Sequence, residues 1–273
     1  MTRATVVAMP GACLVGVGIA LSCMLPIAAQ TAPPSRQPRT AGPATPGLIE
    51  DLVAANRILA AEGIVEAYGH VSVRHDRDPN RYLMARSVAP VLVTAADIME
   101  FDLESRAVEG STSLPVKERY IHGEIYKARP DVMAIIHSHS YAVIPFTVSS
   151  VPLRAMFVTA GFIGDGLPVF EIRDVEKVTN LLVENEARGR ALARTLGDRP
   201  AVLMRGHGAA VVGPSLKIAV GQSVYLNVSA KLQADAIRLG GTVTYMEPEE
   251  ARASTGDTFE RAWDYWKRRL KEK

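Results

Sequence analysis

The sequence predicts an α/β protein in which a central mixed β-sheet is covered by helices on both faces, a three-layer α/β/α sandwich. Segments with strand and helix patterns are mixed along the chain, which favours layered α/β folds. Residues 132–136 form a continuous apolar run, as strands buried on both faces do. The composition is that of a soluble globular chain, because 48% of its 273 residues are hydrophobic and 22% are charged.

The individual elements follow from hydrophobic spacing and from turn residues. Apolar residues recur at helical spacing after residue 48. Asp76 to Asn80 is a turn between two strand-like runs and predicts a hairpin, and Pro115 suits the first turn of a helix. We expect helices at 48–62, 115–127, 174–196, 215–239 and 259–270, and strands at 71–74, 82–85, 132–136, 201–204 and 209–212.

The N-terminal segment has the pattern of a secretory signal. Arg3 precedes a mostly apolar run from Val6 to Ile27, and small residues follow it. This pattern predicts a signal over residues 1–29 with cleavage after Ala29. The mature protein is then expected to be periplasmic or secreted, with no membrane association. The alternatives are a membrane anchor of roughly 20 residues and lipidation at Cys23.

The remaining chain divides into a linker and one domain. Residues 30–47 are rich in Pro and Gly and predict a linker, so the domain, with its C-terminal helix, spans residues 48–273. Both cysteines, Cys13 and Cys23, lie in the signal segment, and the mature chain is expected to contain no disulfide or thiolate metal site. Lys and Arg number 31 against 29 Asp and Glu, a balance that gives no indication of nucleic-acid binding.

Histidines near strand ends are the strongest chemical signal. His137 and His139 follow a buried strand two residues apart, so their side chains are expected on the same face. His207 lies between Gly206 and Gly208 after another strand. Taken separately, His137 and His139 could be a hydrogen-bonded polar pair at a strand end, and His207 could be a solvated residue in a turn. Together, three neutral imidazoles match a catalytic metal site, with Zn²⁺ favoured and Mn²⁺, Co²⁺ or Fe²⁺ as alternatives.

The order of these motifs resembles a known family. Pro-x-x-Glu at 115–118, Arg-Pro-Asp at 129–131, His-x-His at 137–139 and Gly-His-Gly at 206–208 follow Gly-His-Val-Ser-Val-Arg at 69–74. Over roughly residues 48–245 this order is similar to the class II aldolase/adducin family. The resemblance implies that His137, His139 and His207 hold a metal, that Glu118 is the acid–base residue, and that the protein is a homotetramer with sites between subunits. Taken alone, a glutamate near a helix start, such as Glu118, is more often a helix-dipole partner than a catalyst.

Departures from the sugar-phosphate members predict a different substrate. His70 stands where those members have Asn, Val116-Lys117 replaces their serine pair, and residues 84–90 replace their Thr-Pro-(Ser/Thr)-Gly turn. The small hydroxyls and glycine amides that cradle a phosphate are therefore missing. We expect His70, Arg86 and Lys117 to bind a small carboxylic acid instead. These features resemble a decarboxylase branch whose substrates include 2-hydroxy-3-carboxymuconic semialdehyde and dihydroxyphthalate acids.

The resulting hypothesis is a divalent-metal-dependent carbon–carbon lyase, a decarboxylase in aromatic-acid breakdown that works through a metal-stabilised enolate. One alternative is an aldolase or epimerase acting on a non-phosphorylated sugar or hydroxy-aldehyde. Others are a non-catalytic adducin-like assembly domain and a periplasmic binding protein for metal or carboxylate. The predicted export is in tension with ring-cleavage catabolism, which is usually cytoplasmic.

Overall fold

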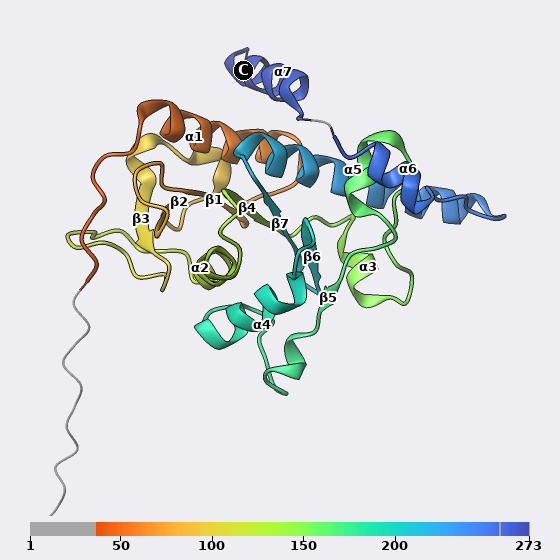
Figure 1. Ribbon diagram of the computed structural model, residues 1–273, viewed down its shortest axis with the longest axis horizontal. Coiled ribbons are helices and arrows are strands. Elements are labelled where there is room, and N and C mark those ends of the chain that lie inside the picture. Colours follow the sequence, from red (N-terminus) through yellow and green to blue (C-terminus); the bar gives the residue numbers. More distant parts are fainter. Residues whose placement is uncertain (1–36, 257, 273) are drawn as a thin grey trace, which may run out of the picture. The chain divides into compact units, whose positions relative to one another are not determined.

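A mixed sheet of seven strands forms the centre of the protein, as predicted (Figure 1). The computed structural model describes residues 37–256 and 258–272. The strands are β1 (His70–Arg74), β2 (Arg81–Ala85), β3 (Ile98–Asp102), β4 (Ala134–Ser138), β5 (Val169–Phe170), β6 (Ala201–Met204) and β7 (Gly208–Gly213). They lie in the order β3-β2-β1-β4-β7-β6-β5. All neighbouring strands are antiparallel except β5 and β6, which are parallel.

Helices cover both faces of this sheet and complete the predicted sandwich. They are α1 (Pro46–Ala61), α2 (Arg119–Ala128), α3 (Ile144–Val148), α4 (Glu186–Leu196), α5 (Leu216–Leu239), α6 (Pro248–Ala253) and α7 (Glu260–Lys271). One face of the sheet carries α2 and α4, which pack against each other, while α1, α5 and α7 pack together on the other face (Figure 1).

Alternation along the strands divides the core between the two faces. Ile135 of β4 is buried in the cluster that contains Ile125 of α2 and Leu192 of α4. Its neighbour Ile136 is buried in the cluster that contains Leu52 of α1. Both faces of the central strands are therefore apolar, which explains why the sequence of β4 is hydrophobic without interruption.

Several predicted elements are confirmed with small shifts. The hairpin of β1 and β2, the helix α1, the strands β6 and β7 and the helices α5 and α7 occur as expected. Ser215 caps α5, because its side chain accepts a hydrogen bond from the backbone N–H of Ile218. The strand β4 lies two residues later than expected, so His137 belongs to the strand itself. The hydrophobic and turn patterns did not predict β3, β5, α3 and α6.

The prediction of one long helix over residues 174–196 is wrong, because the α-helix in this range covers only α4 (Glu186–Leu196). The helix α4 begins after Asn185, whose side chain caps it by accepting a hydrogen bond from the backbone N–H of Arg188. Leu181 has a φ of 67°, which a helix does not allow. The predicted helix at 115–127 is also shorter than expected, since α2 begins at Arg119. Both shortened helices leave turn and loop residues next to Glu118.

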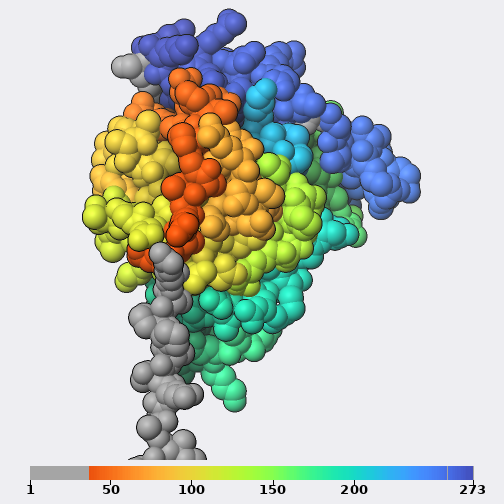
Figure 2. Space-filling view, turned by 60° about the vertical axis from the view of Figure 1, so that its left-hand side comes forward, coloured from red at the N-terminus to blue at the C-terminus, as the bar shows by residue number. Residues whose placement is uncertain are grey.

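The N-terminal predictions fall partly outside the described residues. The expected signal at 1–29 and the first part of the expected linker, residues 30–36, are not among them. Residues 37–45 have no regular secondary structure but are hydrogen bonded to the domain. The backbone N–H of Ala41 donates to Glu100, and that of Thr45 donates to Asp76. Figure 2 shows this red segment lying along the surface.

Within residues 37–256 and 258–272, no helix combines the length and the hydrophobicity that a membrane span requires.

Replacing Gly189 by alanine should test the close packing of α4 on α2. A Cβ at position 189 would lie 2.5 Å from the carbonyl oxygen of Tyr120. Overpacking of this kind costs about 1–3 kcal/mol and should outweigh the gain in helix propensity of about 1 kcal/mol. Urea unfolding should therefore show a less stable Gly189→Ala protein. The matched control is Gly47→Ala in α1, where a Cβ meets nothing within 4 Å; equal stability changes in both variants would contradict the packing argument.

Candidate metal centre and active site

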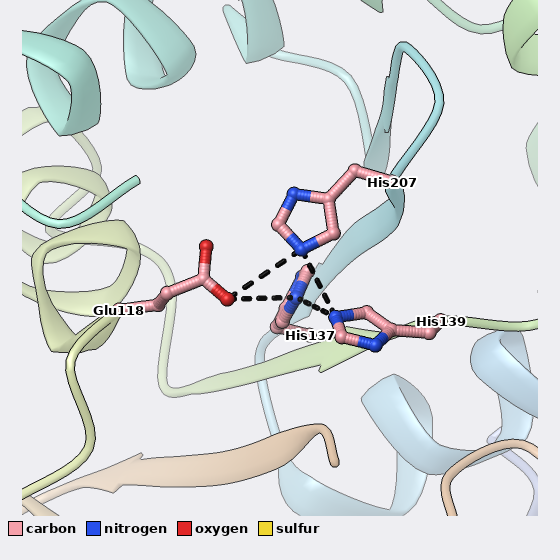
Figure 3. Close-up of side chains that lie close together, drawn as sticks. All are labelled: Glu118, His137, His139 and His207. Atoms are coloured by element: carbon pink, nitrogen blue, oxygen red, sulfur yellow. Dashed lines mark hydrogen bonds and ion pairs between the residues drawn. The ribbon is translucent and has the colours of Figure 1, made fainter. Parts of the chain in front are cut away.

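The pairing of β4 with β7 brings the three predicted histidines together. His137 lies on β4, His139 follows the end of that strand, and His207 immediately precedes β7. Because the strands are antiparallel and Ser138 pairs with Ala209, the end of β4 meets the beginning of β7. The Nε2 atom of His139 lies 3.1 Å from that of His137 and 3.0 Å from that of His207. Figure 3 shows the three rings pointing toward one another.

Glycines beside His207 allow this approach. A Cβ on Gly208 would lie 1.9 Å from the carbonyl oxygen of Ser138, so any side chain there would push β7 away from β4. Gly206 has a φ of 62°, a left-handed conformation that glycine adopts without strain. Gly208 thus permits the close backbone approach of β7 to β4, and Gly206 permits the turn that carries His207.

Glu118 reaches the same point from the opposite side. It directly precedes α2, and its Oε1 atom accepts a hydrogen bond of 2.8 Å from the backbone N–H of Val183. Its Oε2 atom lies 3.7 Å from Nε2 of His137 and 3.5 Å from Nε2 of His207. The loop that was predicted as helix therefore holds one carboxylate oxygen, and the other faces the imidazoles (Figure 3).

Burial sets the protonation states of these groups. Burial lowers the pKa of His137 well below its usual value and also lowers the pKa of His139, so both rings are neutral near pH 7. Burial alone would raise the pKa of Glu118. Hydrogen bonding to His207 and to the backbone N–H of Val183, together with the electrostatic influence of both imidazoles, outweighs that effect and lowers the pKa of Glu118 to about 2. The site thus combines neutral nitrogen donors with an ionised carboxylate.

The side chains fit a divalent cation. Nδ1 of His137 lies 3.1 Å from the carbonyl oxygen of Ala209, which places the ring proton on Nδ1 and leaves a lone pair on Nε2. Converging lone pairs on neighbouring imidazoles need a shared positive partner. The spacing of 3.0–3.1 Å between Nε2 atoms is close to the roughly 3.3 Å of tetrahedral ligands at about 2.0 Å from a zinc ion. Glu118, His137, His139 and His207 are the residues that could hold it.

A cavity of about 490 Å³ opens beside these residues. Glu118 and His139 form part of its wall, and two of the predicted substrate-binding residues, His70 and Lys117, line it as well. The other lining residues are mostly apolar: Ala67, Tyr68, Gly69, Ser87, Val88, Ala89, Leu114, Pro115, Val116 and Leu182. The site therefore joins a polar metal-binding end to an apolar wall.

Arg86, the third predicted substrate-binding residue, does not line this cavity. Its Nε atom donates a hydrogen bond of 2.7 Å to Oδ1 of Asp97. The other carboxylate oxygen, Oδ2 of Asp97, accepts from the backbone N–H and the hydroxyl of Thr94. Arg86 therefore stabilises a turn through Asp97, and its neighbour Ser87 lines the cavity instead.

A buried set of polar side chains behind His70 was not predicted from the sequence. His122 is fully buried, and its ring lies 2.6 Å from both His70 and Ser72. Tyr126 extends the set through its hydroxyl. The spacing of His70 and Ser72 on a strand and of His122 and Tyr126 on a helix was a usable signal, since both pairs share a face.

Comparison with known proteins agrees with this architecture. A family model described as "Class II Aldolase and Adducin N-terminal domain" matches residues 50–234, which include Glu118 and all three histidines of the cluster. In Talaromyces stipitatus, "Decarboxylase tropJ" is 29% identical to the chain over 248 residues, which cover 81% of this chain and 93% of the relative.

A second relative is the "3,4-dihydroxyphthalate decarboxylase" of Arthrobacter keyseri. It is 28% identical over 213 residues, which cover 72% of this chain and 82% of the relative. Among solved structures, the L-fuculose 1-phosphate aldolase from Glaciozyma antarctica PI12 superposes with a TM-score of 0.68 at 23% identity, over 83% of this chain and 93% of the aldolase. That likeness supports the fold, and the resemblance inferred from the motifs is confirmed.

Acid should destabilise the fold through His122. Burial lowers the pKa of His122 from 6.5 to about 3, so between these values the unfolded chain binds a proton that the folded chain does not. The free energy of unfolding should therefore fall as the pH drops below about 6.5, by up to about 1.4 kcal/mol per pH unit from this residue. Urea unfolding of the chelator-treated protein measures it. His122→Asn should weaken the pH dependence, and identical slopes in the two proteins would refute this assignment.

Proposed function

Because the chain belongs to the class II aldolase and adducin family, we propose that it is a divalent-metal-dependent decarboxylase of a small hydroxy or oxo carboxylic acid. One observation carries this proposal: a buried carboxylate, Glu118, lies beside three converging imidazole nitrogens. A binding or assembly domain has no need of that combination. Both of the decarboxylases described above match most of the chain and support the reaction type.

The cavity supports an aromatic acid as substrate. Its wall is mostly apolar, with Val88, Leu114 and Leu182 among the lining residues, and such a surface suits a planar ring better than a polyhydroxylated sugar. Lys117 also lines the cavity and can pair with a second anionic substituent. The substrate named for the Arthrobacter keyseri relative, 3,4-dihydroxyphthalate, has this chemistry, and we propose the same class for this chain.

The chain's own residues account for the proton transfers. Glu118 is ionised, so it must first accept a proton, and a hydroxyl of the substrate beside the carboxyl group is the available donor. The bond between the ring carbon and the carboxylate then breaks, carbon dioxide leaves, and the electron pair stays with the substrate. Glu118 returns its proton to that carbon, which forms the new carbon–hydrogen bond, and solvent restores the hydroxyl proton.

A divalent cation held by His137, His139 and His207 would supply Lewis-acid stabilisation of the negative charge that the substrate gains as carbon dioxide departs. Imidazole ligands favour Zn²⁺, with Mn²⁺, Co²⁺ and Fe²⁺ as alternatives. The hydrogen bond from Val183 to Oε1 of Glu118 keeps the other oxygen directed at the substrate throughout.

Two further proposals concern the whole chain. The signal-like residues 1–29 support export to the periplasm, and an uncleaved N-terminus that begins at Met1 in the mature protein would refute this proposal. The family resemblance supports a homotetramer with sites between subunits, in which the exposed Tyr141 helps to complete the pocket of a neighbouring chain. The Tyr141 hydroxyl donates a hydrogen bond to Glu66. A monomer in light-scattering measurements would contradict the second proposal.

Substituting Glu118 by glutamine should abolish turnover while leaving the metal in place. The metal-loaded protein is expected to release carbon dioxide from 3,4-dihydroxyphthalate, and Glu118→Gln should be about 10²–10⁴-fold slower, because the proton carrier is lost. Glu109→Gln, at an exposed position, is the control and should keep full activity. Aldehyde formation from a non-phosphorylated sugar, with no carbon dioxide released from the dihydroxyphthalate, would favour the aldolase alternative, and full activity of Glu118→Gln would exclude the proposed role.

Substituting His139 by alanine should lose both metal and activity. Two imidazoles remain in that variant, too few for the expected coordination, and metal analysis after dialysis should find much less than one ion per chain. His75→Ala is the control, since His75 is buried away from the cluster and bonds to the carbonyl of Gly42. If His139→Ala retained a full equivalent of metal, the three-histidine site would be wrong.

A further inference from the structure

A continuous chain of buried hydrogen bonds runs from the core to the active-site cavity. Tyr126 and His122 lie one turn apart on α2, and Ser72 and His70 lie two residues apart on β1. The Tyr126 hydroxyl is 2.9 Å from Oγ of Ser72, which is 2.6 Å from Nδ1 of His122. Nε2 of His122 is in turn 2.6 Å from Nδ1 of His70. We call these four residues the relay.

The distances indicate which way the protons point. The single hydroxyl proton of Tyr126 can go to Ser72 at 2.9 Å or to the carbonyl oxygen of Met133 at 3.5 Å. The second distance lies at the limit for a hydrogen bond, and this carbonyl already accepts from the backbone N–H of Arg74 at 2.8 Å. Tyr126 therefore donates to Ser72.

The remaining protons then follow in order. A serine hydroxyl that accepts from Tyr126 donates its own proton to Nδ1 of His122. Neither buried ring has a carboxylate in hydrogen-bond contact among the described residues, so each carries one ring proton. That of His122 sits on Nε2 and is donated to Nδ1 of His70. The proton of His70 must accordingly sit on Nε2.

This Nε2 atom is buried and has no hydrogen-bond partner among the described residues. His70 lines the cavity, and a buried donor without an acceptor is unfavourable by about 1–3 kcal/mol. We infer that His70 presents an N–H group to the cavity and donates it to a carboxylate oxygen of the substrate, and that Ser72, His122 and Tyr126 fix this tautomer. The inference names a recognition residue for the proposed decarboxylation and rests on that function for the identity of the acceptor.

A neutral donor suits a carboxylate that is about to leave. A cation paired with that group would stabilise its full negative charge in the bound substrate more than in the transition state, where the charge has moved toward the ring. A neutral imidazole N–H orients the carboxylate with a weaker electrostatic preference. The charged Lys117 is then available for a substituent that stays on the ring.

The tautomer can be measured directly by nitrogen-15 NMR of histidine rings in the full-length, zinc-loaded protein. His70 should be protonated on Nε2 in the wild type. Ser72→Ala removes the donor to His122 and should convert His70 to a mixture of tautomers or to the Nδ1-protonated form. Ser223→Ala, at a buried serine that bonds to the carbonyl of Ala219, should change nothing. Protonation of His70 on Nδ1 in the wild type, or no change in Ser72→Ala, would overturn the relay.

Ligand binding tests the acceptor. Calorimetry should show that zinc-loaded wild type binds 2,3-dihydroxybenzoate more tightly than catechol, which lacks the carboxylate. His70→Phe should weaken binding of the acid by about tenfold or more, as expected for a hydrogen bond to a charged group, and leave catechol within about twofold. His70→Gln keeps a donor and should retain the preference. Equal losses for both ligands would refute the contact, whereas absence of turnover with the predicted tautomer present would count against the proposed function alone.

Discussion

The antiparallel contact between β4 and β7 is the constraint on which the site depends. It places the residue before β7 next to the residue after β4, so that His207 meets His137 and His139, which are distant from it along the chain. The contact is close enough that Gly208 has no room for a side chain against the carbonyl of Ser138. The apolar residues of both strands are buried on two faces, and this burial holds the metal-binding nitrogens in register.

The second element of the site is the electrostatic balance that burial creates. Neutral imidazole nitrogens and an ionised Glu118 face one another in a buried site, where their lone pairs are unfavourable without a positive partner. A cation would complete this balance. The loop before α4 contributes by donating the Val183 N–H to Glu118, so a segment without regular structure positions the residue to which we assign the proton transfers.

The site residues differ in how well the sequence predicted their positions and roles. The two-residue spacing of His137 and His139 was sufficient to predict a shared face, because alternation in a strand is local. His207 required the pairing of two strands, and the role of Glu118 came from the family resemblance, because no local pattern brings a helix start to a strand end. Arg86 was misplaced because its partner, Asp97, lies eleven positions away, in a turn that the hydrophobic pattern did not reveal.

X-ray absorption spectroscopy of the zinc-loaded, full-length protein tests the central claim most directly. We predict one ion per chain with the multiple-scattering signature of three imidazoles at about 2.0 Å and oxygen donors in the remaining positions. A spectrum that contains only oxygen ligands, or fewer than three imidazoles, would contradict the convergence of His137, His139 and His207 on a single cation.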